Sequence, residues 1–451
     1  MNSWKPLVYL FVLIWMISRS AVHAEAATKC EPTDERALVL SGGGAKGAFE
    51  AGAIFHFVNH RDCDFRDIAG VSVGALNGAY LAEASSDADS LANLKLRSQG
   101  LVDFWRSING PDDILRPRFL GKLRLVLFGL DSINDFTPLE KIIEREVHPT
   151  KIREGNRSLR VGVVSFYDGV YHEVDPKQVP DDGEFRKYVL ASASIPVNAR
   201  LPRIRSAASD GGPGSEIQYA DGGVSHTTPL VAYFSPCDFS PKFLFRDLKK
   251  FGRVTPCVAS GLQEHDGPIR ELFVVLANPY DPASTSLETR ETAISDGRKI
   301  LGRTLDVLTE SPYRWDLNFA LAANRMLTWR QDAYAWAKSI AEEEKAREMM
   351  AILGEGSAGQ TEFPVRSANP GPEGFSLPYK MGIVAPSRVY ADTYGFEKAN
   401  IRLQLYKGCI YADLMVVREF EMDSMRDACK REFPVTPEQL RDDPDPPLEP
   451  R

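Results

Sequence analysis

The 451-residue sequence lacks several features that would assign it to a common class of protein. After the first 24 residues, no segment is apolar enough to cross a bilayer. The net charge is −8, no basic stripe is long enough to bind a nucleic acid backbone, and no internal repeat is present. Multi-span, nucleic-acid-binding and repeat proteins are therefore excluded. A composition with 43% hydrophobic residues indicates an ordinary globular protein with enough chain to bury a core.

Recognisable metal motifs are also lacking. The six cysteines have no zinc-binding spacing, and the acidic residues have no EF-hand spacing. An even number of cysteines in an exported chain favours disulfides, although the sequence alone allows many pairings. Because Cys30 and Cys63 precede neighbouring strands, they form a geometrically sensible pair. The expected pairs are Cys30–Cys63, Cys237–Cys257 and Cys409–Cys429.

The first 24 residues resemble a secretory signal. Lys5 gives a positive start, Leu7 to Ile17 is apolar, and Val22-His23-Ala24 offers small residues for cleavage. The apolar run is too short for a spanning helix, although a retained membrane anchor is the alternative. Cleavage removes Lys5 and Arg19 and no acidic residue, which gives −8 − 2 = −10. We expect an exported protein, either periplasmic or secreted.

The first part of the expected domain alternates strands and helices. Ala37–Leu40 is typical of a short buried strand, and a glycine loop over residues 41–47 follows it. Residues 48–59 have a helical pattern, residues 67–71 form a second strand, and residues 74–84 form a small-residue helix. This order predicts a βαβ unit and a parallel sheet.

In the rest of the chain, the expected strands and helices do not alternate regularly. Residues 354–378 are rich in Gly, Pro, Ser and Glu and predict a loop or linker within one domain spanning 30–435, and the proline-rich end, 436–451, predicts a disordered tail. The expected strands are 159–164, 169–173, 217–219 and 272–276, and the expected helices are 137–147, 286–309, 315–350 and 399–419.

A candidate nucleophile lies at the end of the second strand. Gly70-Val71-Ser72-Val73-Gly74 matches G-x-S-x-G, in which glycines allow the crowded, strained turn that exposes a serine between a strand and a helix. The helix N-terminus favours developing negative charge. The alternative is a strand–helix turn with an incidental serine.

The glycine loop over residues 41–47, which follows the first strand, has two interpretations. Gly42, Gly44 and Gly47 have the spacing of a dinucleotide loop, but the next strand does not end in the acidic residue that such a site needs. Consecutive glycines also let amide groups converge on a developing oxyanion. The adjacent G-x-S-x-G turn favours this second interpretation, with Gly42, Gly43 and Gly44 as candidates.

The candidate base is Asp221. Asp221-Gly222-Gly223 follows an expected strand, and a carboxylate within hydrogen-bond reach of a serine can act as its base. An ordinary Asp-Gly turn is the alternative. A Ser72–Asp221–His226 triad would have the chain order of α/β-hydrolases, but His226 is only a few residues from Asp221.

Together these three blocks resemble the patatin-like phospholipases, whose motifs occur in the same order. Weaker similarities are found at 135–139, 191–196 and 228–230, and the resemblance covers residues 37–230 well and 380–415 loosely. Ser41 stands where many members have aspartate, and Lys46 where many have arginine, so this position keeps a charge but not a forked donor. Val197 to Arg200 also departs from the family's proline-rich stretch.

This resemblance implies a three-layer α/β/α fold with a mostly parallel sheet. It implies a serine lipid acyl hydrolase of phospholipase A type, with Ser72 as nucleophile, Asp221 as base and an acyl-enzyme intermediate. It implies no metal or cofactor. The residues expected to support these motifs are Lys46, Gly47, Gly70, Gly74, Gly222 and Gly223.

The expected partner is a phospholipid or other acyl lipid, met during transient contact with a membrane surface. The mixed basic and apolar segment Arg116–Phe128 could lie on lipid, or could pack in the core with solvated charges. A serine esterase with the triad and a non-catalytic lipid-binding relative are the alternatives to a dyad enzyme.

Overall fold

The computed structural model describes residues 29–86, 89–118, 132–155, 157–205, 216–234, 268–280, 297–340, 342–345, 377–390, 393–419 and 423–447. The expected signal sequence, the pair Cys237–Cys257 and most of the segments 116–128 and 354–378 lie outside these ranges. Among the helices that the structure describes, none combines the length and apolar character needed to cross a membrane.

A mostly parallel sheet forms the centre of the molecule, as predicted. Its strand order is β10-β9-β1-β2-β5-β8-β7, and β6 pairs with β5 on a separate edge. The register of β1 with β2 runs parallel from Ala37↔Asp67 to Leu40↔Gly70, which confirms the expected βαβ unit. The parallel strands are β1 (Arg36–Leu40), β2 (Asp67–Val71), β5 (Ser158–Ser165), β9 (Glu271–Val275) and β10 (Lys380–Val384). β6 (Tyr171–Val174) and β8 (Glu216–Asp221) run antiparallel to β5, and β7 (Arg203–Arg205) pairs antiparallel with β8.

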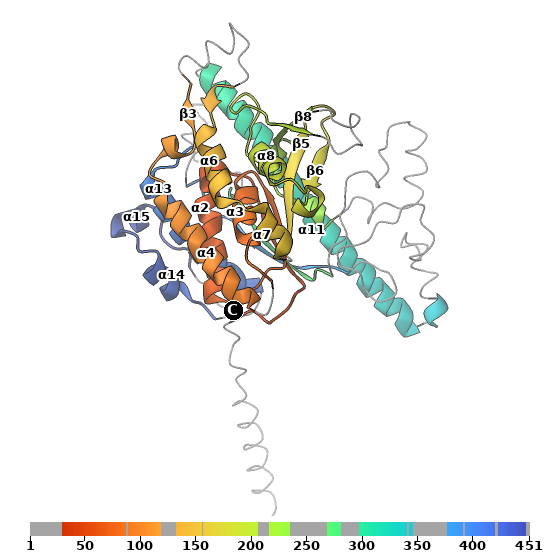
Figure 1. Ribbon diagram of the computed structural model, residues 1–451. Helices are drawn as coiled ribbons and strands as arrows, with labels where there is room; N and C mark the ends of the chain where they lie inside the picture. Colours follow the sequence, from red (N-terminus) through yellow and green to blue (C-terminus); the bar gives the residue numbers. More distant parts are fainter. Residues whose placement is uncertain are drawn as a thin grey trace, which may run out of the picture.

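Helices cover both faces of this sheet, and its central strands are therefore buried on both sides. One face packs against α2 (Gly47–Phe55), α3 (Val73–Ala82), α4 (Ser90–Ser107), α8 (Asp182–Ser192) and α13 (Lys398–Glu419). The other face packs against α11 (Gly297–Ile340), through Leu317, Ala320 and neighbouring residues. Figure 1 shows the two helical layers, with α11 running diagonally past the strands and α13, α14 and α15 gathered on the other side.

The remaining elements are short. A two-stranded ribbon joins β3 (Arg116–Pro117) to β4 (Asn134–Asp135). The helices α6 (Thr137–Glu146) and α7 (Pro149–Glu154) lead into β5, and α14 (Arg426–Glu432) and α15 (Pro437–Asp442) follow α13. The last turn of α2 continues as a π-helical turn, His56–His60.

The prediction of separate helices at 286–309 and 315–350 is wrong. Residues 297–340 form one helix, although Pro312 lies inside it. A proline removes one helical hydrogen bond and favours a break. Here the segment after the proline is anchored, because Leu317, Ala320 and Leu327 are buried against the sheet.

The predicted disorder of 436–451 is corrected for residues up to 447. Thr436 caps α15 with a capping box to Gln439. Beyond α15, Asp443 and Asp445 form ion pairs with Lys407, a fully buried residue of α13. The charged tail is ordered because it supplies the partners of a buried ammonium group.

Two of the expected disulfides are present. Cys30 is bonded to Cys63, ahead of β1 and β2, and Cys409 of α13 is bonded to Cys429 of α14. The described cysteines include no free thiol.

Candidate active site

Ser72 lies on a strained turn between β2 and α3. Its φ is 57° and its ψ is −123°, a backbone conformation that is rare for residues other than glycine. The strain is held by a hydrogen bond from the Ser72 amide to the Ser192 Oγ at 2.8 Å. Ser192 in turn donates to the Gly162 carbonyl of β5 at 2.6 Å. The neighbouring strand and α8 therefore fix the turn from the side.

The two glycines of the G-x-S-x-G motif are required by close packing. A Cβ on Gly70 would lie 2.3 Å from the Gly74 carbonyl oxygen, and one on Gly74 would lie 2.5 Å from the Leu40 carbonyl oxygen. Any side chain at either position would push the turn out of place. Gly47 has a similar role, since its Cβ would lie 2.2 Å from Val73.

Asp221 ends β8 directly beside Ser72. The side chain of Ser72 forms a hydrogen bond with the Asp221 carboxylate. The Gly223 amide also donates to Asp221 Oδ1 at 2.7 Å, and the Asp221 amide donates to the Ser194 carbonyl at 3.0 Å. Complete burial raises the pKa of Asp221 to about 7, against the lowering effect of these hydrogen bonds. The structure thus brings together the predicted serine and a carboxyl group whose pKa is suited to proton transfer at neutral pH.

The glycine loop offers two amides to this site. In the described part of the chain, neither the Gly43 nor the Gly44 amide donates a hydrogen bond to an acceptor. Gly44 has a φ of 59°, and a Cβ there would lie 2.2 Å from the Thr393 carbonyl oxygen, so only glycine fits. These two amides remain candidates for the oxyanion hole.

The inclusion of Gly42 among the oxyanion donors is corrected. Its amide already donates to the Thr227 carbonyl at 2.8 Å. A Cβ on Gly42 would instead lie 3.2 Å from the Ser72 Cβ, so this glycine makes room for the nucleophile. Thr227 lies after the Asp221 turn, which joins the glycine loop to the loop that carries the base.

His226 does not complete a triad. Its Nδ1 lies 2.6 Å from Asp316 Oδ1 of α11, and its ring packs edge-on against Tyr171 at 4.8 Å between centroids. Asp316 also accepts a hydrogen bond from the Thr228 amide at 3.0 Å. The histidine therefore ties the Asp221 loop to α11, and neither Ser72 nor Asp221 is among its hydrogen-bond partners.

The supporting residues have structural contacts. Lys46 is buried, and its Nζ donates to Asn278 Oδ1 at 2.5 Å after β9. Gly222 packs against β5, since its Cβ would lie 2.6 Å from the Gly162 carbonyl oxygen, and Gly223 supplies an amide to Asp221. Sequence reasoning missed Ser192 and Thr227. Ser192 lies in the 191–196 block, which was noted without a role.

An apolar cavity opens at Ser72. Its free space is about 60 Å³ and is bounded by Ser72 and the glycine loop at one end and by aromatic and aliphatic side chains beyond them. The lining residues are Gly44, Ser72, Val73, Leu76, Phe104, Trp105, Ile108, Ile114, Leu115, Phe136, Leu139, Ile143, Val189, Ala193, Ile195, Thr393, Tyr394 and Phe396.

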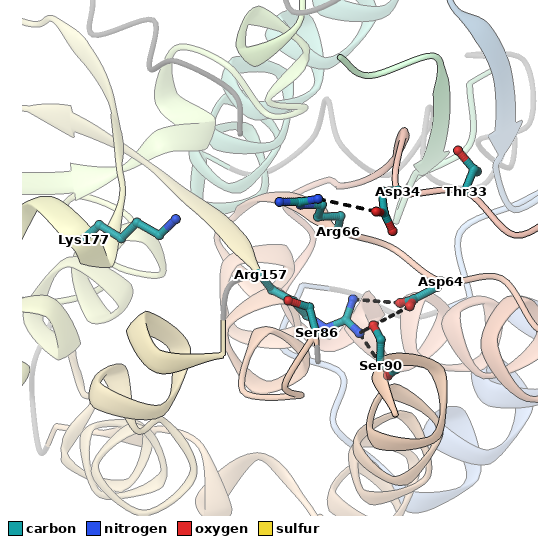
Figure 2. Close-up of a pocket in the computed structure, with 8 residues that line it drawn as sticks. All are labelled: Thr33, Asp34, Asp64, Arg66, Ser86, Ser90, Arg157 and Lys177. Carbon is teal, nitrogen blue, oxygen red and sulfur yellow. Dashed lines mark hydrogen bonds and ion pairs between the residues drawn. The ribbon is translucent and has the colours of Figure 1, made fainter. Parts of the chain in front are cut away.

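A larger polar cavity, about 540 Å³, lies elsewhere, at the opposite ends of the parallel strands. It contains residues that precede β1, β2 and β5, whereas Ser72 follows β2. Figure 2 shows Arg157 bonded to Asp64 and Ser90, and Arg66 paired with Asp34. These two cations are committed to acids, and the serine that donates to a carboxylate here, Ser90 to Asp64, also contacts Arg157 and lacks the strained backbone of Ser72, so this cavity is not a candidate active site.

Comparison with known proteins finds one family match, within the first part of the described chain. A family model for patatin-like phospholipases matches residues 38–233. No curated protein matches the chain at a significant level. Among solved structures, VipD from Legionella pneumophila is similar at 12% identity and a TM-score of 0.28, over 89% of this chain and 76% of that chain. The ExoU–SpcU complex of the type III secretion system of Pseudomonas aeruginosa is similar at 15% identity and a TM-score of 0.22, over 91% of this chain and 74% of that chain.

Scores this low do not establish a shared fold, so the assignment rests on residues 38–233. A mostly parallel sheet flanked by helices, with a serine on a strained strand–helix turn, defines a hydrolase that acts on carboxylic esters. Residues 38–233 match the patatin-like phospholipase family, as the sequence motifs predicted, and a lipid ester hydrolase is the activity that this match supports.

Proposed function

We propose that the protein is a phospholipase A-type acyl hydrolase that uses Ser72 and Asp221 as a catalytic dyad. The observation that carries this proposal is the hydrogen bond between the Ser72 side chain and Asp221, a fully buried carboxyl group with a pKa of about 7. The amides of Gly43 and Gly44 lie on the adjacent loop, and neither has an acceptor among the residues that the structure describes.

The proposed reaction has two halves. Asp221 accepts the Ser72 proton as the Oγ attacks the ester carbonyl, and the Gly43 and Gly44 amides stabilise the resulting oxyanion. The protonated Asp221 then gives its proton to the departing alcohol, and the acyl-enzyme remains. Water, deprotonated by Asp221, attacks this acyl group and releases the fatty acid and free Ser72. His226 takes no part, since it is paired with Asp316.

The cavity beyond Ser72 supports a long acyl chain as the substrate. Its walls are almost entirely aliphatic and aromatic, as expected for a site that removes hydrocarbon from water. The free space of about 60 Å³ holds only a few water molecules. Partly buried aromatic side chains such as Phe104 and Tyr394 must therefore move apart as the chain enters.

A row of exposed apolar side chains on α11 supports contact with a membrane surface. Trp315, Trp329 and Trp336 are 71%, 56% and 59% exposed, and their spacing in multiples of seven residues places them on one face of the helix. Met326 is exposed on the same face. Tryptophan favours the boundary between lipid and water. We call these four residues the tryptophan row.

Export is also part of the proposal. Two disulfides among the described residues suit an oxidising compartment. Fractionation of cells that produce the protein, with sequencing of its N-terminus, should find it outside the cytoplasm and beginning near residue 25. Cytoplasmic protein that retains residues 1–24 would contradict export.

The dyad is tested with three variants on phospholipid vesicles and on a short soluble ester. Ser72→Ala and Asp221→Asn should each lower kcat by about 10⁴-fold. His226→Ala should keep most of the activity, and circular dichroism checks that each variant is folded. If His226→Ala is folded and as inactive as Ser72→Ala, the dyad is wrong and the triad is favoured. Mass spectrometry of the lipid products shows whether fatty acid and lysophospholipid form, as A-type cleavage requires.

A further inference from the structure

Two histidines and two cysteines meet in a buried cluster on the side of the molecule that carries α13 and α14. His56 Nδ1 lies 3.1 Å from His60 Nδ1, and Cys409 Sγ lies 3.6 and 3.9 Å from these two nitrogens. Cys429 Sγ lies 3.5 Å from His56 Nδ1. All four ligand atoms lie within 4.8 Å of one another. We call these four residues the His–Cys cluster.

These separations resemble the edges of a tetrahedral zinc site. With Zn–N near 2.0–2.1 Å and Zn–S near 2.3 Å, ligand atoms around zinc lie about 3.3–3.8 Å apart. The nitrogen–nitrogen distance and the three nitrogen–sulfur distances fall close to this range. The two nitrogen atoms are slightly closer than this range, and the two sulfur atoms are much closer because Cys409 and Cys429 are joined as a disulfide. Breaking that bond would leave four donors already converging on one point.

The surroundings suit a metal ligand as well. His56 Nε2, the ring nitrogen that faces away from the sulfurs, lies 3.4 Å from the buried carboxylate of Asp413. A carboxylate at this position orients a ligating histidine and holds the proton on its outer nitrogen. Arg61 Nε donates to this same nitrogen at 3.2 Å, so metal binding at Nδ1 requires that contact to open and the Nε2 proton to face Asp413; Arg61 also pairs with Asp413 at 2.6 Å, which balances the carboxylate charge.

The ligands come from segments far apart in the sequence, and this explains why no zinc spacing is visible. His56 and His60 form the π-helical turn after α2, where an i, i+4 spacing puts both rings on one face. Cys409 lies in α13, which packs tightly on α2, since a Cβ on Gly408 would lie 1.9 Å from the Phe49 carbonyl oxygen. Cys429 lies in α14.

We propose that the His–Cys cluster is a structural zinc site when Cys409 and Cys429 are reduced. Reduction by a phosphine consumes one water: the phosphine gives two electrons and becomes a phosphine oxide, while the disulfide becomes two thiols. Zn²⁺ then binds the two sulfurs as thiolates, releasing two protons, together with Nδ1 of His56 and of His60. An oxidant that restores the disulfide releases the metal. One cluster therefore holds α13 and α14 on α2 in either redox state.

The test uses the purified protein, oxidised or reduced with a phosphine that does not bind zinc. The reduced protein should bind a single Zn²⁺ per chain, and its Tm should rise with added zinc. With Co²⁺ in place of zinc, it should show the visible absorption of a tetrahedral site and the ultraviolet band of thiolate–cobalt charge transfer. The oxidised protein should show none of these changes.

Variants locate the site. His60→Gln removes one ligand from a partly exposed position, and it should weaken zinc affinity by at least about 100-fold while leaving the oxidised protein as stable as before. The double variant Cys30→Ser, Cys63→Ser removes the other disulfide found among the described residues and should leave zinc binding unchanged. Zinc binding that survives His60→Gln, or that is lost with Cys30 and Cys63, overturns the proposal. The proposal is also overturned if the reduced protein neither binds zinc nor gains stability when zinc is added.

Discussion

At the scale of single residues, the site shows how burial alone can make a carboxyl group into a base. An exposed aspartate has an ordinary pKa near 3.8 and is too weak a base to take a serine proton at neutral pH. Asp221 is fully buried, and the loss of hydration raises its pKa to about 7 despite the two hydrogen bonds that favour the charged form.

This pKa predicts the pH dependence of the reaction. Asp221 accepts a proton only when ionised, so kcat/KM should fall about tenfold per pH unit below pH 7 and level off above it. A soluble ester should be used, because its hydrolysis does not depend on a lipid surface. His226→Ala should keep the same inflection. A profile that loses its inflection in that variant would point to the histidine as the titrating base.

Ser192 is predicted to be a positioning residue. Ser192→Ala removes the acceptor for the Ser72 amide and the donor to Gly162, so the strained turn should relax. We expect kcat to fall about 100-fold with little change in KM, because a small displacement of a nucleophile is costly. Ser194→Ala is the matched control: its hydroxyl, just beyond the end of α8, donates to the Leu190 carbonyl of that helix, and kcat should be nearly unchanged. Equal kcat values for the two variants would contradict this role.

The site residues that the sequence predicted are marked by local patterns, whereas those that it missed depend on partners far along the chain. Ser72 and Asp221 are marked by neighbouring glycines, because the crowding that demands glycine is local. The engagement of Gly42 by Thr227 and the support of Ser72 by Ser192 depend on residues far along the chain, and no local pattern records them. The His–Cys cluster is missed for the same reason.

At the scale of elements, the buried strands were the most predictable. β1, β2, β5 and β9 are short apolar runs, and the structure places them close to the expected residues. The helices α4 and α8 were not predicted. The length of α11 was missed because Pro312 favours a break, whereas its buried face depends on a sheet surface that the local sequence does not contain.

The tryptophan row on α11 predicts a separation of two activities. Trp329→Ala with Trp336→Ala should lower hydrolysis of zwitterionic vesicles by at least about tenfold. Burial of part of one tryptophan ring in lipid, at about 25 cal/mol/Å², contributes more than the ~1.4 kcal/mol that corresponds to a tenfold change in binding. Hydrolysis of a soluble ester should stay unchanged. The control is Gln331→Ala with Asp332→Ala, which alters exposed polar residues of the same helix. Equal losses on vesicles in both double variants would rule out the row as the membrane contact.

At the scale of the whole molecule, residues outside the family domain complete the fold around it. The match ends at residue 233, yet β9 and β10 extend the central sheet and α13 covers α2. The Cys409–Cys429 disulfide and the ion pairs of Lys407 then tie the last helices to α13. The C-terminal segment therefore stabilises the layer that supports the glycine loop.

This arrangement predicts that the tail is needed for stability. Lys407 is fully buried, and its Nζ contacts the Asp443 carboxylate at 3.1 Å, the Asp445 carboxylate at 3.2 Å and the Asp443 carbonyl at 2.7 Å. Asp443→Asn with Asp445→Asn leaves this ammonium without a counter-charge, so the free energy of unfolding should fall by about 3–5 kcal/mol. Urea denaturation at neutral pH measures the change.

The effect should depend on Lys407 itself. Replacing it with methionine in the same background removes the buried charge, and most of the lost stability should return. Glu438→Gln, an exposed change on α15, should alter the free energy of unfolding by no more than about 0.5 kcal/mol. If the double aspartate variant is as stable as the parent protein, the tail contacts α13 without contributing to the free energy of unfolding. A loss that Lys407→Met does not reverse would place its cause in the aspartates' other contacts, such as that of Asp443 with Arg388.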